Sequence, residues 1–74
     1  MLLCDAKKGN MYKIEEVLAV GVVKSRLQSI SLTVGKRLVV KGWSIFNSSV
    51  LIEIDGRLVA IRKNIASKIK VKND

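Results

Sequence analysis

The sequence predicts a mainly β protein: a small barrel of about five short strands with one short inserted helix and a short helical turn near the carboxyl end. Apolar residues between Val23 and Val40 change from helical spacing to two-residue alternation within a few positions. Asp55-Gly56 separates two β-rich runs, which is typical of a two-residue hairpin. The chain has 74 residues and a hydrophobic fraction of 49%, so we expect one domain with one core, residues 1–74.

The amino-terminal part of the chain predicts a turn followed by a strand. Glycine and asparagine at the end of Lys7 to Asn10 both tolerate the positive φ that a tight turn needs. The stretch from Tyr12 to Val20 has strand composition but does not alternate cleanly, so its register stays open. Gly21 is expected to end this strand.

A short helix is expected next, from Val22 to about Ser29. It has one apolar stripe for the strands, made of Val23, Leu27 and Ile30, while Lys24, Arg26 and Gln28 face solvent. Two helical turns are not stable alone, so packing onto the strands must hold them. The stretch Thr33 to Lys36, with glycine near its end, predicts a turn into the following strand.

The middle of the chain predicts a strand and a connecting loop. From Arg37 to Trp43, Leu38 and Val40 would share one face of the strand. Gly42 to Ser49 is expected to form a loop, and it holds Trp43 and Phe46, two of the three aromatic residues. These two side chains either pack onto the core or form an exposed apolar contact surface.

The hairpin from Val50 to Arg62 is the clearest local pattern. A type I′ turn at Asp55-Gly56 fixes its register. One face would hold three opposed pairs and the other face two: Ile54–Arg57, Ile52–Val59 and Val50–Ile61, then Glu53–Leu58 and Leu51–Ala60. Both faces are largely apolar, which predicts strands that are covered on both sides in a curled sheet.

The carboxyl end predicts one helical turn and an edge strand. Asn64 is a favourable N-cap for a turn through Ile65 to Ser67. Ile69 and Val71 then alternate with lysines, and lysines on an edge strand deter sheet-to-sheet association. Together these elements predict a small SH3-like barrel.

The residue inventory argues against catalysis. The chain has no histidine, which removes the commonest general base and metal ligand. Gly35-Lys36-Arg37 lacks the upstream glycine and the hydroxyl residue of a phosphate-binding loop, and a single cysteine cannot supply paired zinc ligands. We therefore expect no enzyme activity, cofactor, metal site or small-molecule substrate.

The cysteine content, the length of the apolar runs and the net charge indicate the compartment and the kinds of partner. Cys4 cannot form an internal disulfide, which fits a reducing compartment. The longest apolar run, Val17 to Val23, is far shorter than the roughly 20 residues that span a bilayer. Fourteen basic residues against six acids give a net charge of +8, which favours anionic partners such as nucleic acid, an acidic protein surface or an anionic membrane face.

Three segments resemble the ferrous iron transport protein A (FeoA) family: the Gly9 turn, the stretch RLQSISLTVG from Arg26 to Gly35, and LVAIRK from Leu58 to Lys63 after the hairpin. Members of that family carry a helix reading approximately R-L-x-x-L-G-L-x-x-G and a later strand reading approximately L-A-L-R. The resemblance covers Leu3 to Val71. The family usually has glycine at the position of Ser31 and a Pro-x-Gly-x-Pro loop in place of Ser44 to Ser49.

The resemblance implies a cytoplasmic, non-enzymatic SH3-like accessory protein of bacterial ferrous iron uptake. Its partner would be the cytoplasmic GTP-binding domain of the membrane permease, the B component. We expect the helix and the turn at Leu32 to Gly35 to face this partner. The expected contacts are four apolar anchors and four basic residues: Leu32, Val34, Trp43 and Phe46, with Lys24, Arg26, Lys36 and Arg37.

Two other functions remain open at this stage. A basic small barrel could bind nucleic acid, with Tyr12 and Trp43 as the aromatic residues available for stacking. The same small domain also occurs at the carboxyl end of some metal-dependent repressors, so the chain could be a regulatory domain. The start at Met1 and the lack of a DNA-reading helix favour a free-standing protein.

Overall fold

Five antiparallel strands form one sheet in the spatial order β4-β3-β2-β1-β5. The computed structural model describes all 74 residues. The strands are β1 (Met11–Val17), β2 (Arg37–Trp43), β3 (Ser49–Ile54), β4 (Arg57–Arg62) and β5 (Ile69–Asn73). The predicted strand from Arg37 to Trp43 is confirmed in full.

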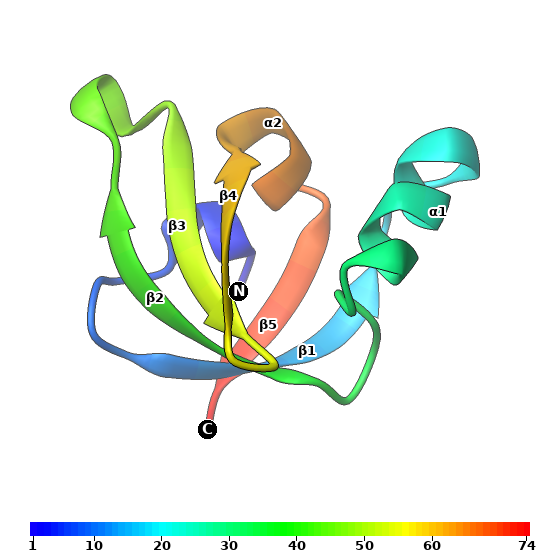
Figure 1. Cartoon of the computed structure of the whole chain (residues 1–74), viewed down its shortest axis with the longest axis horizontal. Coiled ribbons are helices and arrows are strands. Elements are labelled where there is room, and N and C mark those ends of the chain that lie inside the picture. The colour runs from blue at the N-terminus through cyan, green and yellow to red at the C-terminus, as the bar shows by residue number, and fades with distance from the viewer.

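Two α-helices and two short 3-10 turns complete the chain: α1 (Gly21–Ser29), α2 (Lys63–Ala66), η1 (Leu3–Asp5) and η2 (Ile45–Asn47). The sheet curls around the core, and α2 connects β4 to β5, the two ends of the strand order (Figure 1). Helix α1 lies to one side of the sheet, and the loop with η2 lies at the other end of the long axis. The predicted mainly β class, with one inserted helix and a carboxyl-terminal helical turn, is confirmed.

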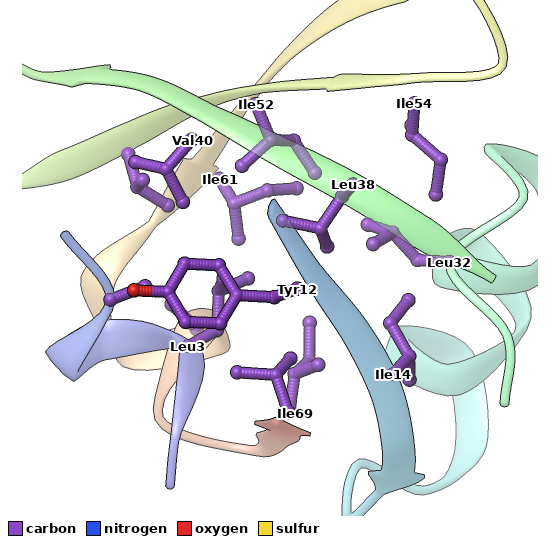
Figure 2. Close-up of a cluster of buried hydrophobic side chains, with 14 of the residues drawn as sticks. Leu3, Tyr12, Ile14, Leu32, Leu38, Val40, Ile52, Ile54, Ile61 and Ile69 are labelled. Carbon is purple, nitrogen blue, oxygen red and sulfur yellow. The ribbon is translucent and has the colours of Figure 1, made fainter. Parts of the chain in front are cut away.

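The core consists of sixteen buried residues, all of them hydrophobic. Figure 2 shows side chains from opposite walls of the curled sheet, such as Leu38 and Ile69, pointing into one interior. Tyr12 is the largest of the fully buried residues, and its hydroxyl accepts a hydrogen bond of 2.9 Å from the backbone N–H of Lys7. A buried hydroxyl without such a partner would be costly, so this bond ties the amino-terminal turn to the core.

The β3–β4 hairpin has the predicted register at every position. Asp55 and Gly56 have φ values of 52° and 74°, as a type I′ turn requires. The expectation that both faces are covered is wrong, because Leu58 on the outer face is 64% exposed and Ala60 is exposed as well. The helices pack at the edges and ends of the sheet, so the outer apolar face stays open.

Strand β1 ends at Val17, three residues earlier than predicted. Its register against β5 shifts between Ile14 and Glu16, which marks a β-bulge. The N–H of Leu18 then donates to the carbonyl of Lys68, at 2.7 Å, as the chain leaves the sheet. The bulge explains why the sequence does not alternate cleanly in this region.

Helix α1 and the turn after it follow the prediction. Leu27 is the only buried residue of α1, while Val23 and Ile30 are partly buried against the core. Gly35 has a φ of 92°, the left-handed conformation expected of the turn glycine. With so little of α1 buried, most of its surface remains available for contacts.

The carboxyl end differs from the prediction in one detail. Asn64 does not cap a helix: α2 begins at Lys63, and its N-cap Arg62 makes no side-chain capping bond. The N–H of Lys63 donates instead to the carbonyl of Ser48, at 2.9 Å, so a backbone carbonyl from the loop between β2 and β3 accepts the first free N–H of the helix.

Strand β5 is an edge strand, as predicted, but the chain's own amino terminus covers part of its outer edge. Leu2 forms an isolated bridge with Lys70, and the N–H of Val71 donates to the carbonyl of Met1 at 2.7 Å. The ammonium group of Met1 donates in return to the carbonyl of Val71, at 3.1 Å. Lysines and this short segment together protect the edge from pairing with another molecule.

Candidate partner-binding surface

A hollow of about 300 Å³ lies between α1, the end of β1 and the turn after the helix. Seven residues line it: Glu16, Val17, Lys24, Gln28, Leu32, Thr33 and Val34. Three of the eight expected contact residues, Lys24, Leu32 and Val34, therefore meet at one place. The hollow combines an apolar floor with one acid and one base at its rim, which suits a protein contact better than a buried small ligand.

The turn that carries Val34 is fixed from both sides. The N–H of Gly35 donates to the carbonyl of Ile14 at 2.9 Å, and the N–H of Lys36 donates to the carbonyl of Thr33 at 3.2 Å. Val34 is held at the tip of this turn with 64% of its surface exposed. Leu32, by contrast, is fully buried, so it supports the turn from below and is not an exposed anchor.

Ser31 begins this turn in a left-handed conformation, with a φ of 68°. Residues with a Cβ adopt that conformation at an energetic cost, whereas glycine does so freely. Ser31 stands where the resembled family usually has glycine, and its positive φ is one that glycine adopts more easily than serine.

Two of the basic residues in this region are paired. Lys36 Nζ lies 3.3 Å from Asp55 Oδ2 at the tip of the hairpin, and Arg37 forms an ion pair with Asp74. Hydrogen bonding from Ser31 and then from Lys36 holds the pKa of the Asp55 carboxyl below its usual value. Lys24 takes part in no ion pair, so its charge is available at the rim of the hollow.

Exposed apolar residues extend the surface toward the start of α1. Val20 is 78% exposed and Val22 is 69% exposed, and Leu18 nearby is half exposed. Val20 directly precedes α1, the helix whose residues Lys24 and Gln28 line the hollow. Val20 and Val22 are not among the contact residues expected from the sequence, although both lie in the apolar run from Val17 to Val23.

Arg26 faces a different groove. That groove, of about 210 Å³, lies between α1 and β4 and is lined mainly by apolar residues: Val23, Arg26, Leu27, Ala60, Ile61, Arg62 and Ile65. Arg26 therefore lies on the opposite side of the helix from Lys24, and one flat partner surface would not contact both in the same way.

The structure separates Trp43 and Phe46 from the other expected contacts. Both lie in or beside the η2 loop, at the far end of the molecule from α1 (Figure 1). Trp43 is partly buried, and its Nε1–H donates to the carbonyl of Ala6 at 3.1 Å. Phe46 is 96% exposed. The expected contacts thus fall into two groups, one around the hollow and one around this loop.

The geometry gives little support to a metal site or to a nucleic-acid site. No three residues among His, Cys, Asp and Glu come together as a metal-binding group. Tyr12, one of the two aromatics considered for base stacking, is fully buried and cannot stack on a nucleotide. No helix is long and apolar enough to cross a bilayer.

The sequence matches the FeoA domain family over residues 1–73, nearly the whole chain. The chain belongs to the FeoA domain family. The resemblance found in the Arg26 to Gly35 segment is therefore confirmed. No curated protein matches this FeoA domain.

Solved structures support the assignment. The solution structure of the FeoA protein from Chlorobium tepidum is 27% identical, with a TM-score of 0.91, over 99% of this FeoA domain and 70% of that chain. Iron(II) transport protein A from Clostridium thermocellum has a TM-score of 0.94 at 19% identity, over 99% of this domain and 45% of that chain. A manganese-dependent transcriptional repressor has a TM-score of 0.91 at 20% identity, over 100% of this domain and 36% of that chain.

These similarities define the fold as SH3-like and link the family to iron transport. FeoA domains are in general accessory domains without an enzymatic activity of their own. The chain spans less than half of the transport protein from Clostridium thermocellum and of the repressor.

Proposed function

We propose that this FeoA domain is a non-enzymatic accessory protein of ferrous iron uptake that binds the cytoplasmic GTP-binding domain of the membrane permease. The observation that supports it best is the exposed apolar surface around the hollow beside α1. Family membership supplies the link to iron transport.

The hollow surface has the composition of a protein contact. Val34 lines the hollow and is exposed, and Val20 is exposed where the chain enters α1; both would bury their exposed area against the partner. Lys24 at the rim would steer an acidic partner surface and favour one orientation of docking. Lys36 and Arg37 follow the turn that carries Val34 but are already partly neutralised by Asp55 and Asp74, and Arg26 faces the other groove.

Titration calorimetry with the permease's purified cytoplasmic domain tests the proposal at low salt. We expect measurable binding that Val34→Ser weakens by about tenfold, because the side chain loses its apolar contact. Leu58→Ser is the matched control, since Leu58 is also 64% exposed but lies on β4, outside the hollow. Absence of binding by the unmodified protein would contradict the proposal.

The similarity to a manganese-dependent repressor supports a second candidate, a regulatory domain of a longer metal-responsive protein. In that case the hollow surface would bind another domain of the same protein. Calorimetry with the permease's cytoplasmic domain separates the candidates: binding favours the accessory function, and its absence favours the regulatory function.

A further inference from the structure

The loop between β2 and β3 presents an apolar tip that the proposed function does not use. Phe46, at 96% exposure, is the most exposed large hydrophobic side chain in the protein, and Ile45 beside it is 78% exposed. The two residues form η2 with Asn47, at the far end of the molecule from α1 (Figure 1). A solvent-exposed apolar pair of this kind marks an interaction site.

Hydrogen bonds hold this loop in shape at its base. The N–H of Ser44 donates to the carbonyl of Ser49, and the N–H of Asn47 donates to the carbonyl of Ser44, each at 2.9 Å. The N–H of Ser49 also donates to the Ser44 hydroxyl at 2.9 Å. The tip is therefore presented by an ordered base and not by a free flexible segment.

The backbone at the tip is in an unfavourable conformation. Phe46 and Asn47 have φ values of 64° and 54°, in the left-handed region. A bulky aromatic residue rarely adopts this conformation, and strain of this kind concentrates at functional sites. No core contact compensates for it, because the Phe46 side chain is almost entirely exposed.

Basic residues surround the base of the tip. Lys7, Lys8 and Lys63 line one hollow of about 330 Å³ together with Asn47 of the loop, and Asp5 is the only acid that lines it. None of the three lysines takes part in an ion pair. Trp43 also lines this hollow, and tryptophan favours the boundary between lipid and water.

We propose that the η2 loop is a shallow membrane anchor, in which Ile45 and Phe46 insert among the acyl chains of an anionic bilayer while Lys7, Lys8 and Lys63 contact the lipid headgroups. The apolar tip is too small for a stable protein interface, which needs roughly 800 Å² from each partner. Lysine is depleted at the buried core of protein interfaces, whereas a cluster of lysines is attracted to anionic lipid. Apolar insertion and charge attraction together give the two signals that stable membrane anchoring requires.

This anchor is compatible with the proposed partner contact. The loop and the hollow beside α1 lie at opposite ends of a molecule that is 28 Å long, so both can be occupied at once. The membrane proposal does not depend on the identity of the protein partner, and it is tested with the purified protein and vesicles alone.

Co-sedimentation with vesicles tests the anchor. We expect the protein to bind vesicles of phosphatidylcholine with phosphatidylglycerol and not vesicles of phosphatidylcholine alone. Phe46→Ser should weaken binding by about tenfold, because one inserted aromatic side chain is lost. Val34→Ser is the control at the other end of the molecule and should leave vesicle binding unchanged. Neither substituted side chain is buried, so both variants should fold.

A fluorescence measurement separates insertion from charge attraction alone. The native Trp43 is first replaced by Phe, so that each variant carries a single indole. In that background, Phe46→Trp should shift its emission to shorter wavelength on anionic vesicles and be quenched by brominated acyl chains, whereas Val34→Trp should show neither effect. Unchanged vesicle binding by Phe46→Ser, or an unshifted Phe46→Trp spectrum, would overturn the proposal. So would a loss of affinity for the permease domain in Phe46→Ser with vesicle binding intact.

Discussion

The turn around Val34 and the loop around Phe46 share the same local features and differ in their surroundings. Each contains a left-handed residue other than glycine, Ser31 in one and Phe46 in the other, and each displays an exposed apolar side chain. The turn lies beside acids that pair with its basic residues, whereas the loop lies above lysines that have no partner. Two loops with similar backbone conformations can therefore bind different partners, and the charged residues near each loop determine which partner it binds.

The largest expected effect is that a charged substitution in each region weakens binding to one partner and leaves binding to the other unchanged. Val34→Asp should lower affinity for the permease domain by about 30-fold, since it replaces apolar burial with a carboxylate that must lose water. Phe46→Asp should do the same to anionic vesicle binding, and neither variant should affect the other partner. Calorimetry and co-sedimentation on both variants measure this; one variant that weakens both partners would show that the two regions act as a single surface.

A smaller effect concerns the lysines. Lys63→Gln should weaken binding to anionic vesicles by about fivefold, as each lysine near a membrane surface contributes about 1 kcal/mol. Lys36→Gln removes the same charge from the turn, where Lys36 pairs with Asp55, and should change vesicle binding by less than about twofold. Vesicle titrations at constant ionic strength compare the two, and equal losses would mean that only net charge matters.

Backbone strain in the two regions is expected to be of similar size. Ser31→Gly and Phe46→Gly should each raise the free energy of unfolding by about 0.5–1.5 kcal/mol, because glycine adopts a positive φ freely. Removing the Phe46 side chain loses no core packing, since it is 96% exposed. Urea unfolding measures both changes; a destabilised Phe46→Gly would reveal packing of the aromatic ring.

The smallest expected effect is on pH dependence at the turn. The folded-state pKa of Asp55 lies below its ordinary value of 3.8, so its contacts stabilise the fold above that pH and are lost as the pH falls through the lower folded-state value. The stability of the unmodified protein relative to Asp55→Asn in urea unfolding should therefore fall as the pH is lowered from about 5.5 to about 2. Because Asp55 is exposed, the change will be small, and a stability difference that does not vary with pH would contradict it.

The sequence predicted those elements that depend on local chemistry. Asp55-Gly56 fixed the hairpin register because a two-residue turn leaves no freedom in pairing. Gly35 marked the turn after α1 for a similar reason. The end of β1 was missed because a bulge depends on the partner strand, and the Asn64 cap was wrong because the carbonyl of Ser48 already serves the start of α2.

The candidate site was predicted less well than the fold. Lys24, Leu32 and Val34 come together as expected, yet the sequence could not show that Leu32 points inward. Trp43 and Phe46 were grouped with them as apolar residues of the loop predicted from Gly42 to Ser49, and only the curl of the sheet shows that this loop lies at the other end of the molecule. Val20 and Val22 are exposed because the sheet covers little of the start of α1, and this cannot be predicted from the local sequence pattern.

The paired backbone groups of Met1 and Val71 have a consequence for the connectivity of the chain. Because residue 1 sits directly against a position three residues from the last, a linker of about four to six residues could join the two ends into a ring. A circular permutant could then be opened elsewhere, for example between Lys7 and Lys8, with every strand pairing retained. The order in which the strands are synthesised is thus separable from the architecture that they build.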